Sequence, residues 1–565
     1  MKAILKFAFA VCLASVAGSA SVKAQTVELN GLGSSGLFLE LGLGANDSAG
    51  GINAPCVWSE NTNTVQANDT STGSTLSDKG SAWVAWTKGT GTCAAPATGY
   101  KVYSYLSTDS VVGNRCLYNA NLSTAKCSIA YPTTDPSSAG IILGASGEVA
   151  LPTVVATALN SAKVNYAGTD IRPEDAEFAI TRALTNCGSV VGSSTQYLGL
   201  GYTNGTAINS FFSTSSFNVI NFALPSSFTV TPVGATPIIV AVNDSSTGGT
   251  GLRAFSNITS QNLAFILDGT SSYTSNVSTA GTTTGSPIYV NIREPLSGTY
   301  NTTEFNVPNR VGTSGGSFAT SQDVGLNQPS TQRNCTVTSP WPVPSTTVST
   351  VKENALNFAT PSGGARQRAI GTGQELSEIV TNAHGQTIGY GFWSFANFAG
   401  LSAVTTAKYY DVDGVDPLNT SNVIPGSSTT ISLSTTADGK YPIWSLLRLV
   451  NVGSTQNSNV AALATAAQTY SSGSHVDFVP LDQMEVVRSH FSPAGQTVAS
   501  LSNGSGSSAW GSNTALDCNS AETGGDVGGV VIGLNTTSLT QLPLTKSDET
   551  YCLNTNASGQ TGSRR

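Results

Sequence analysis

Two continuous apolar runs constrain the fold of this chain more than any other feature. The runs TPIIVAVN (236–243) and SPIYVNIRE (286–294) are rich in β-branched and aliphatic residues, which is typical of strands buried on both faces of a sheet. Between them, NITSQNLAFILDG (257–269) predicts a short amphipathic helix with Thr259 or Ser260 as its N-cap. A strand, a helix and a second strand in this order predict a parallel βαβ unit and an α/β fold.

Two later segments continue this pattern. IGTGQELSEIV (370–380) predicts a helix, because Thr372 is followed three residues later by Glu375, the spacing of a capping box. TIGYGFWSFANF (387–398) predicts an aromatic, glycine-rich strand together with its exit.

Long stretches rich in turn-forming residues separate the predicted elements, and we interpret them as surface insertions. They are 59–82, 269–286, 311–350 and the Ser/Gly/Asn-rich stretch from about residue 499 to the end. A chain of 565 residues also implies two or more domains.

The first 24 residues predict an export signal. Lys2 and Lys6 form a basic start, 7–17 is largely apolar, and the small residues before Gln25 are typical of a cleavage site after Ala24. The apolar run is too short to span a membrane. We therefore expect a periplasmic or secreted protein with no membrane span once the signal is removed.

The cysteine count fits an exported protein. Cys12 lies inside the predicted signal, which leaves an even number of cysteines for an oxidising compartment. They are Cys56, Cys93, Cys116, Cys127, Cys187, Cys335, Cys518 and Cys552. Eight cysteines allow about 105 pairings, so the sequence predicts disulfides without choosing among them. A bridge between Cys518 and Cys552 is one candidate.

The charge balance excludes some classes of partner. The formal net charge is −8 and only 10% of residues are charged, so neither nucleic acid nor an anionic membrane surface would attract the chain. A small anion responds to local donors more than to overall charge and remains possible as a ligand. With three histidines and no Cys-x-x-Cys pair, we expect no metal and no other cofactor.

The segment IREPLSGTYNTTEF (292–305) carries the most specific chemistry. A strand ending at Arg293 is followed by Ser297, Gly298 and Thr299, where a helix is predicted to begin. Unpaired backbone N–H groups at a helix N-terminus bind anions, the two hydroxyls add donors, and the arginine provides a planar fork suited to an oxyanion. The alternative is structural: Ser297 caps a helix and Arg293 forms a surface salt bridge.

In its context this segment resembles the periplasmic phosphate-binding proteins of transport systems, which have the two-lobed type II periplasmic binding protein fold, a PBP-like domain. The resemblance implies that Arg293, Ser297, Gly298 and Thr299 bind phosphate. It also implies transport as the role and an ABC permease as a partner.

Three other stretches are similar to motifs of this family. LNGLGSSGLF (29–38) resembles the opening loop that contacts phosphate, with Ser34, Ser35 and Gly36 in that place, although the register is open by one residue. KVNYAGTDIRPED (163–175) resembles the strand and turn whose aspartate accepts a hydrogen bond from protonated phosphate, and Asp170 is the match. Taken alone, Asp170 could equally be a turn or capping residue.

The third stretch is YLSTDSVVGNRC (105–116), where Ser110 corresponds to the family's serine between the first two sites. Asp109 or Arg115 are alternatives for lining the site. Farther on, HGQTIGYGFWSFAN (384–397) resembles the family's strand near the return to the first lobe.

The resemblance implies the following division of the chain. We expect a signal peptide (1–24), lobe 1 with insertions (25–235), lobe 2 (236–395), a return segment of lobe 1 (396–490) and a Gly/Ser/Asn-rich C-terminal extension (491–565).

The sequence thus predicts an exported solute-binding protein that captures phosphate or a similar oxyanion between two lobes, and not an enzyme. An ionised Asp170 would favour an anion that keeps a proton, which distinguishes phosphate from sulfate. The alternative is a secreted surface or matrix protein that uses the same fold for structural or adhesive contacts.

Overall fold

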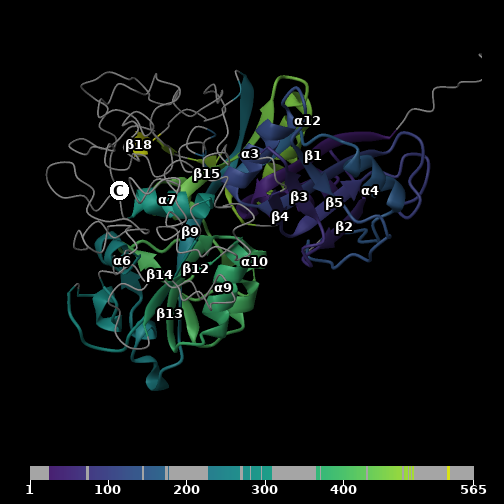
Figure 1. Cartoon of the computed structure of the whole chain (residues 1–565). Coiled ribbons are helices and arrows are strands. Elements are labelled where there is room, and N and C mark those ends of the chain that lie inside the picture. The colour runs from purple at the N-terminus through teal and green to yellow at the C-terminus, as the bar shows by residue number, and fades with distance from the viewer. Residues whose placement is uncertain are drawn as a thin grey trace, which may run out of the picture.

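The structure is a computed structural model of the chain. It describes residues 25–71, 76–142, 145–171, 173, 176, 225, 227–267, 271–279, 281–293, 296–307, 364–369, 371–427, 430–473, 476–480, 483–484, 486–488 and 531–534. Within these residues the chain forms the predicted α/β fold, in which helices pack on a large mixed sheet (Figure 1).

The large sheet runs through the whole described structure. In spatial order its main strands are β2 (Cys56–Glu60), β5 (Ala82–Trp86), β6 (Lys101–Thr108), β1 (Thr26–Ser34), β8 (Tyr166–Thr169), β15 (Trp444–Val452), β9 (Phe228–Asp244), β13 (Gln386–Phe392), β11 (Tyr289–Arg293) and β12 (Ala365–Ala369). Short or additional strands attach to this path: β14 (Ala407–Val412), β10 (Asn257–Ile258) and β16 (Val479–Pro480).

Strand β9 joins two halves of this sheet, which we call lobes. Its first half pairs with β15 over 228–237, and its second half pairs with β13 over 238–244. Lobe 1 contains β1, β2, β5, β6, β8, β15 and the first half of β9, whereas lobe 2 contains β10 to β14 and the second half. Figure 1 shows β9 passing between the two.

The two lobes have the same strand order. In lobe 1 the parallel strands β6, β1 and β8 are followed by the antiparallel β15 and then by β9. In lobe 2 the parallel strands β12, β11 and β13 are followed by the antiparallel β9 and then by β14. If the parallel strands of each lobe are numbered by their order along the chain, both lobes have the spatial order second, first, third, an antiparallel strand, and fourth. The fold is thus two-lobed, with its connections in the middle of the sheet.

Helices cover both lobes and bury separate apolar clusters against the sheet. In lobe 1 they are α2 (Phe38–Asn46), α3 (Ser110–Ala120), α4 (Thr153–Asn160) and α12 (Asn457–Gly473). In lobe 2 they are α6 (Ser260–Leu267), α9 (Gly371–Thr381) and α10 (Phe395–Ser402), with α7 (Gly298–Asn306) following β11 and the short α11 (Ser434–Ala437) preceding β15. None of the described helices is long and apolar enough to cross a bilayer.

Two disulfides tie down lobe 1 and confirm part of the cysteine prediction. Cys56–Cys93 joins β2 to the loop after β5, and Cys116–Cys127 joins α3 to β7 (Cys127–Ala130). The predicted bridge between Cys518 and Cys552, like Cys187 and Cys335, lies outside the described residues.

Three of the predicted insertions contain regular structure. The stretch 59–82 holds β3 (Gln66–Asp69) and β4 (Leu76–Lys79), which form a three-stranded antiparallel sheet with β7. The stretch 269–286 holds the 3-10 turn η8 (Thr274–Val277). In the C-terminal part, β17 (Val486–Arg488) pairs with β18 (Val531–Leu534), and the insertion 311–350 lies outside the described residues.

The prediction of a parallel βαβ unit is wrong. The first run lies in β9, the helix is α6 and the second run is β11, as expected. However, β13 lies between the two strands, antiparallel to β9 and parallel to β11. Strands β9 and β11 therefore run in opposite directions. The local sequence could not indicate this, because the strand between them comes from residues about a hundred positions after β11.

Candidate functional site

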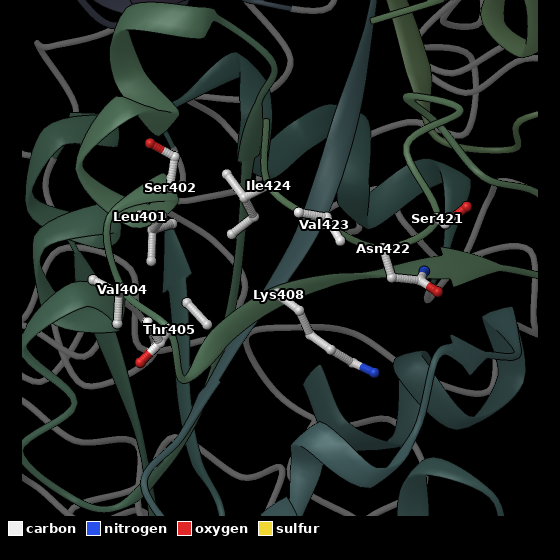
Figure 2. Close-up of a pocket in the computed structure, with 10 residues that line it drawn as sticks. Leu401, Ser402, Val404, Thr405, Lys408, Ser421, Asn422, Val423 and Ile424 are labelled. Carbon is white, nitrogen blue, oxygen red and sulfur yellow. The ribbon is translucent and has the colours of Figure 1, made fainter. Parts of the chain in front are cut away.

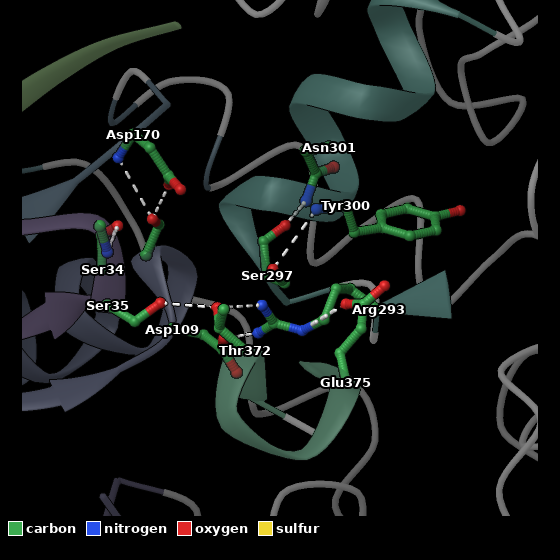
Figure 3. A network of polar contacts seen from close by, with 12 residues as sticks. Ser34, Ser35, Asp109, Asp170, Arg293, Ser297, Tyr300, Asn301, Thr372 and Glu375 are labelled. Atoms are coloured by element: carbon green, nitrogen blue, oxygen red, sulfur yellow. Dashed lines mark hydrogen bonds and ion pairs between the residues drawn. The ribbon is translucent and has the colours of Figure 1, made fainter. Parts of the chain in front are cut away.

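The candidate residues follow the carboxyl ends of parallel strands in both lobes. Ser34 ends β1, Asp109 follows β6 and Asp170 follows β8, whereas Arg293 ends β11 and Thr372 lies after β12 in α9. Ligands in open α/β sheets bind at this edge. Figure 3 shows these side chains facing one another from the two lobes.

The loop after β1 presents hydroxyls and amides. The Ser34 hydroxyl accepts a hydrogen bond from the Gly36 amide at 3.2 Å and caps the 3-10 turn η1 (Ser35–Leu37). The Tyr105 hydroxyl donates to the Ser34 carbonyl at 2.7 Å, which holds the loop in place. The next residue, Ser35, lies with its Oγ 2.8 Å from Thr372 Oγ1 of the other lobe.

Asp170 is the centre of one polar cluster. The Ser110 hydroxyl, at the first residue of α3, donates to Asp170 Oδ1, and the Asp170 amide donates back to Ser110 Oγ at 3.2 Å. The Ser445 hydroxyl of β15 donates to the Asp170 carbonyl at 2.6 Å. These contacts hold Asp170, through its backbone and its carboxyl group, between α3, β8 and β15 of lobe 1.

The same carboxyl group reaches the segment after β11. A Cβ atom at Gly298 would collide with both carboxylate oxygens of Asp170, so only glycine allows this approach. In addition, the Val111 amide of α3 donates to the Leu296 carbonyl at 3.3 Å. The N-termini of α3 and α7 therefore meet at Asp170.

The environment of Asp170 changes its ionisation. Burial raises the pKa of Asp170 to about 7, although Arg293, Arg448 and a hydrogen bond from Ser34 oppose this shift. Near neutral pH the carboxyl group thus exists in both forms. Ionised, it accepts hydrogen bonds; protonated, it also donates one.

Arg293 is the centre of a second cluster that crosses between the lobes. Its side chain is 1% exposed, and Nη1 donates to Thr372 Oγ1 at 2.8 Å. Nη2 lies 2.8 Å from Asp109 Oδ1, and Nε lies 3.8 Å from Glu375 Oε2. Asp109 comes from lobe 1, and the other two partners come from α9 of lobe 2.

The N-terminus of α7 completes the arrangement. Ser297 is the N-cap residue, and its hydroxyl accepts from the Tyr300 amide at 3.3 Å. Thr299 is buried in the first turn. Ser297 thus caps the helix, as the structural alternative expected. The other part of that alternative is wrong, because Arg293 is buried between the lobes and does not form a surface salt bridge.

The structure thus brings the predicted residues together in two adjoining clusters. Ser34, Ser110, Asp170 and Gly298 meet in the first, and Ser35 and Arg293 meet in the second. Arg115, one of the alternatives for lining the site, instead pairs with Asp69 and Asp78 beneath α3.

Two partners of Arg293 were interpreted differently from the sequence. Thr372 is the second residue of α9. Glu375 Oε1 accepts a hydrogen bond from the Tyr390 amide of β13 at 2.9 Å. Because α9 begins at Gly371, Thr372 lies inside the helix and is not its N-cap residue, so the predicted capping box is wrong. The spacing of three residues between Thr372 and Glu375 could not indicate their partners, because Arg293 lies on β11 and Tyr390 on β13.

A separate pocket of about 330 Å³ lies in lobe 2, between the end of α10, the start of β14 and residues 421–424 (Figure 2). Leu401, Val404, Val423 and Ile424 give it an apolar lining, and Lys408 stands at its edge. None of the predicted site residues lines this pocket.

No protein-family model matches the chain, and no curated protein matches it significantly. Among solved structures it is similar to a phosphate-binding protein from Stenotrophomonas maltophilia, at 14% identity over 68% of this chain and 84% of that one, with a TM-score of 0.31. It is also similar to a DING protein, at 13% identity over 66% and 84%, with a TM-score of 0.32.

A third similar structure is an ABC-type phosphate transport receptor from Vibrio cholerae, at 12% identity over 45% of this chain and 74% of that one, with a TM-score of 0.26. Values this low assign neither a family nor a ligand to the chain. The ligand of the site must therefore be inferred from the contacts of its own residues.

Proposed function

We propose that this protein captures phosphate or a similar oxyanion between its two lobes. In this proposal the mature chain is exported, after cleavage near Ala24, and delivers its ligand to an ABC permease. The protein acts by binding and release, without catalysis.

The observation that carries the proposal is the position of Arg293. Its guanidinium is buried where the two lobes meet, at the carboxyl end of β11, with the N-terminus of α7 starting five residues later. A buried guanidinium beside helix N-terminal amides and hydroxyls is suited to a tetrahedral oxyanion, because each oxygen can accept more than one hydrogen bond.

Neutral donors from both lobes support the same proposal. The hydroxyls of Ser34, Ser35 and Ser110 come from lobe 1, and those of Ser297 and Thr299 follow β11 of lobe 2. Because the lobes are joined through the middle of β9, opening and closing about this strand would admit and bury a ligand.

Asp170 supports selection between phosphate and sulfate. Above about pH 7 its carboxylate accepts a hydrogen bond from a protonated phosphate and repels sulfate, which has no proton to donate. Below that pH the protonated carboxyl group can donate to either anion. We therefore expect the preference for phosphate over sulfate to grow as the pH rises through 7, and Asp170→Asn to abolish this growth in competition titrations.

The proposal is tested by calorimetric titration of the mature protein with phosphate. We expect binding in the micromolar range or tighter, weakened by roughly 2 kcal/mol or more in Arg293→Ala. Glu28→Gln is the matched control, because Glu28 forms an ion pair with Lys101 at 3.2 Å near the opposite end of β1. It should bind as the wild type does.

No heat and no thermal shift with phosphate, arsenate or sulfate would contradict the binding proposal. That result would favour a surface or matrix protein in which the fold serves structural contacts.

A further inference from the structure

Asp109 places a carboxylate directly on the arginine of the proposed site. It lies between the end of β6 and the first residue of α3, and its Oδ1 is 2.8 Å from Arg293 Nη2 of the other lobe. Its side chain is 14% exposed, whereas that of Arg293 is 1% exposed. The Asp109 carboxylate is thus within reach of solvent and of an entering anion.

The second acidic partner of Arg293 is fixed. Glu375 is fully buried, its Oε1 accepts from the Tyr390 amide at 2.9 Å, and its Oε2 is 3.8 Å from Arg293 Nε. Because this carboxyl group is held by the backbone of β13, it stays beside the guanidinium whether or not an anion is bound.

The charged groups around the ion pair come from five elements. They are Asp109 before α3, Arg293 of β11, Glu375 of α9, Asp170 after β8 and Arg448 of β15. Arg448 pairs with Thr169 of β8, the residue before Asp170. Two tyrosines also face these groups: Tyr105 of β6, beside Asp170, and Tyr390 of β13, whose hydroxyl accepts from the Arg293 amide at 3.2 Å. Three acids thus surround two arginines.

This balance is unfavourable for a ligand that brings two negative charges. It also provides two carboxyl groups that lie on different sides of the site: Asp109, which can accept a hydrogen bond, and Asp170, which accepts one when it is ionised and can donate one when it is protonated. A dihydrogen oxyanion has two O–H groups to donate and one negative charge, and a monohydrogen dianion has only one O–H group.

Building on the proposed function, we propose that Asp109 is a specificity-determining residue that makes the site select a singly charged, protonated oxyanion over a doubly charged one. The anion approaches Nη2 of Arg293 beside the Asp109 carboxylate and donates an O–H to it. A dianion that uses its single O–H on Asp170 meets Asp109 with like charge.

The test is titration of the mature protein with inorganic phosphate at about pH 5.5 and about pH 8.5, where the monoanion and the dianion predominate in turn. We expect the wild type to bind at least about tenfold more weakly at the higher pH. In Asp109→Asn this ratio should fall to about threefold or less, through tighter binding at the higher pH.

The variants separate charge from structure. Asp109 is the N-cap residue of α3, and asparagine and serine are both favoured there, so Asp109→Ser provides a second neutral variant that preserves the helix start. Asp109→Glu keeps the charge and should keep the wild-type ratio, as should the distant Glu28→Gln. Since Asp170 is the same in all of them, its own titration does not distinguish these proteins.

Equal or tighter wild-type binding at the higher pH would overturn the inference while leaving phosphate capture intact. An unchanged ratio in both neutral variants would do the same. Absence of phosphate binding at both pH values would instead overturn the proposed function.

Discussion

Arg115 and Arg293 are both buried arginines that face two acids, but they do so in different surroundings. Arg115 lies 3.2 Å from Asp69 and 3.6 Å from Asp78, and all three side chains are almost fully buried within lobe 1. Arg293 takes Asp109 from lobe 1 and Glu375 from lobe 2, and Asp109 is partly exposed.

The Arg115 cluster lies within one lobe and is structural, whereas the Arg293 cluster joins two lobes and can change when they move. The Arg115 cluster fixes β3 and β4 to α3, whose first residue, Ser110, holds Asp170. It changes little when the lobes move, because all its members belong to one lobe. The Arg293 cluster must break at Asp109 whenever the lobes separate, so a ligand can compete for the same donor.

The largest effect is expected for Arg115→Met. Removing one partner of a buried ion pair leaves Asp69 and Asp78 without their counter-charge, which should lower the free energy of unfolding by about 3–5 kcal/mol. Urea unfolding measures this loss.

Arg293→Met serves as the counterpart. It should lower the free energy of unfolding less, because Asp109 can regain water and Glu375 keeps the Tyr390 amide, yet it should lose phosphate binding. Equal losses of stability in the two variants would erase the distinction between the clusters.

The next effect concerns closure of the lobes and is expected for Gly298→Ala. The added methyl group collides with the Asp170 carboxylate, so the lobes can no longer meet at this point, and phosphate affinity should fall by about 1–3 kcal/mol. Gly400→Ala is the control, because a Cβ at this helical glycine makes only an ordinary contact, 3.8 Å from Val380 Cγ2. Calorimetry showing wild-type affinity in Gly298→Ala would place the ligand elsewhere.

The smallest effect concerns pH. Burial raises the pKa of Asp78 to about 7, although Arg115 opposes the shift. A buried acid with a raised pKa stabilises the fold while it is protonated, so its contribution is full below about pH 4 and is lost as the pH rises through 7.

Asp78→Asn should therefore flatten the fall in the free energy of unfolding between about pH 4 and pH 7, by roughly 1 kcal/mol per pH unit, without changing phosphate affinity. Chemical denaturation at several pH values provides the test. A steeper fall in the variant would show that Asp78 is ionised over this range in the folded protein.

The sequence predicted elements better than it predicted partners. The run at 236–243 lies in β9, the run at 286–294 contains β11, and 257–269 contains a helix, because neighbouring residues carry the patterns of burial and capping. The relative direction of β9 and β11 was missed, since β13 between them comes much later in the chain.

The same reason explains which site residues were found. Arg293 and 297–299 stand in one short segment, so a local motif was enough. Asp109 is 184 residues from Arg293, and Glu375 contacts β13, so no spacing in the sequence could have revealed either contact.

A small oxyanion should lie between Arg293 and the N-terminus of α7, and a crystal structure of the mature protein with phosphate would show its position. We expect phosphate within hydrogen-bond distance of the Arg293 guanidinium, the Ser297–Thr299 segment and Asp170. Phosphate bound away from these residues, with the contact between Asp109 and Arg293 unchanged, would contradict it.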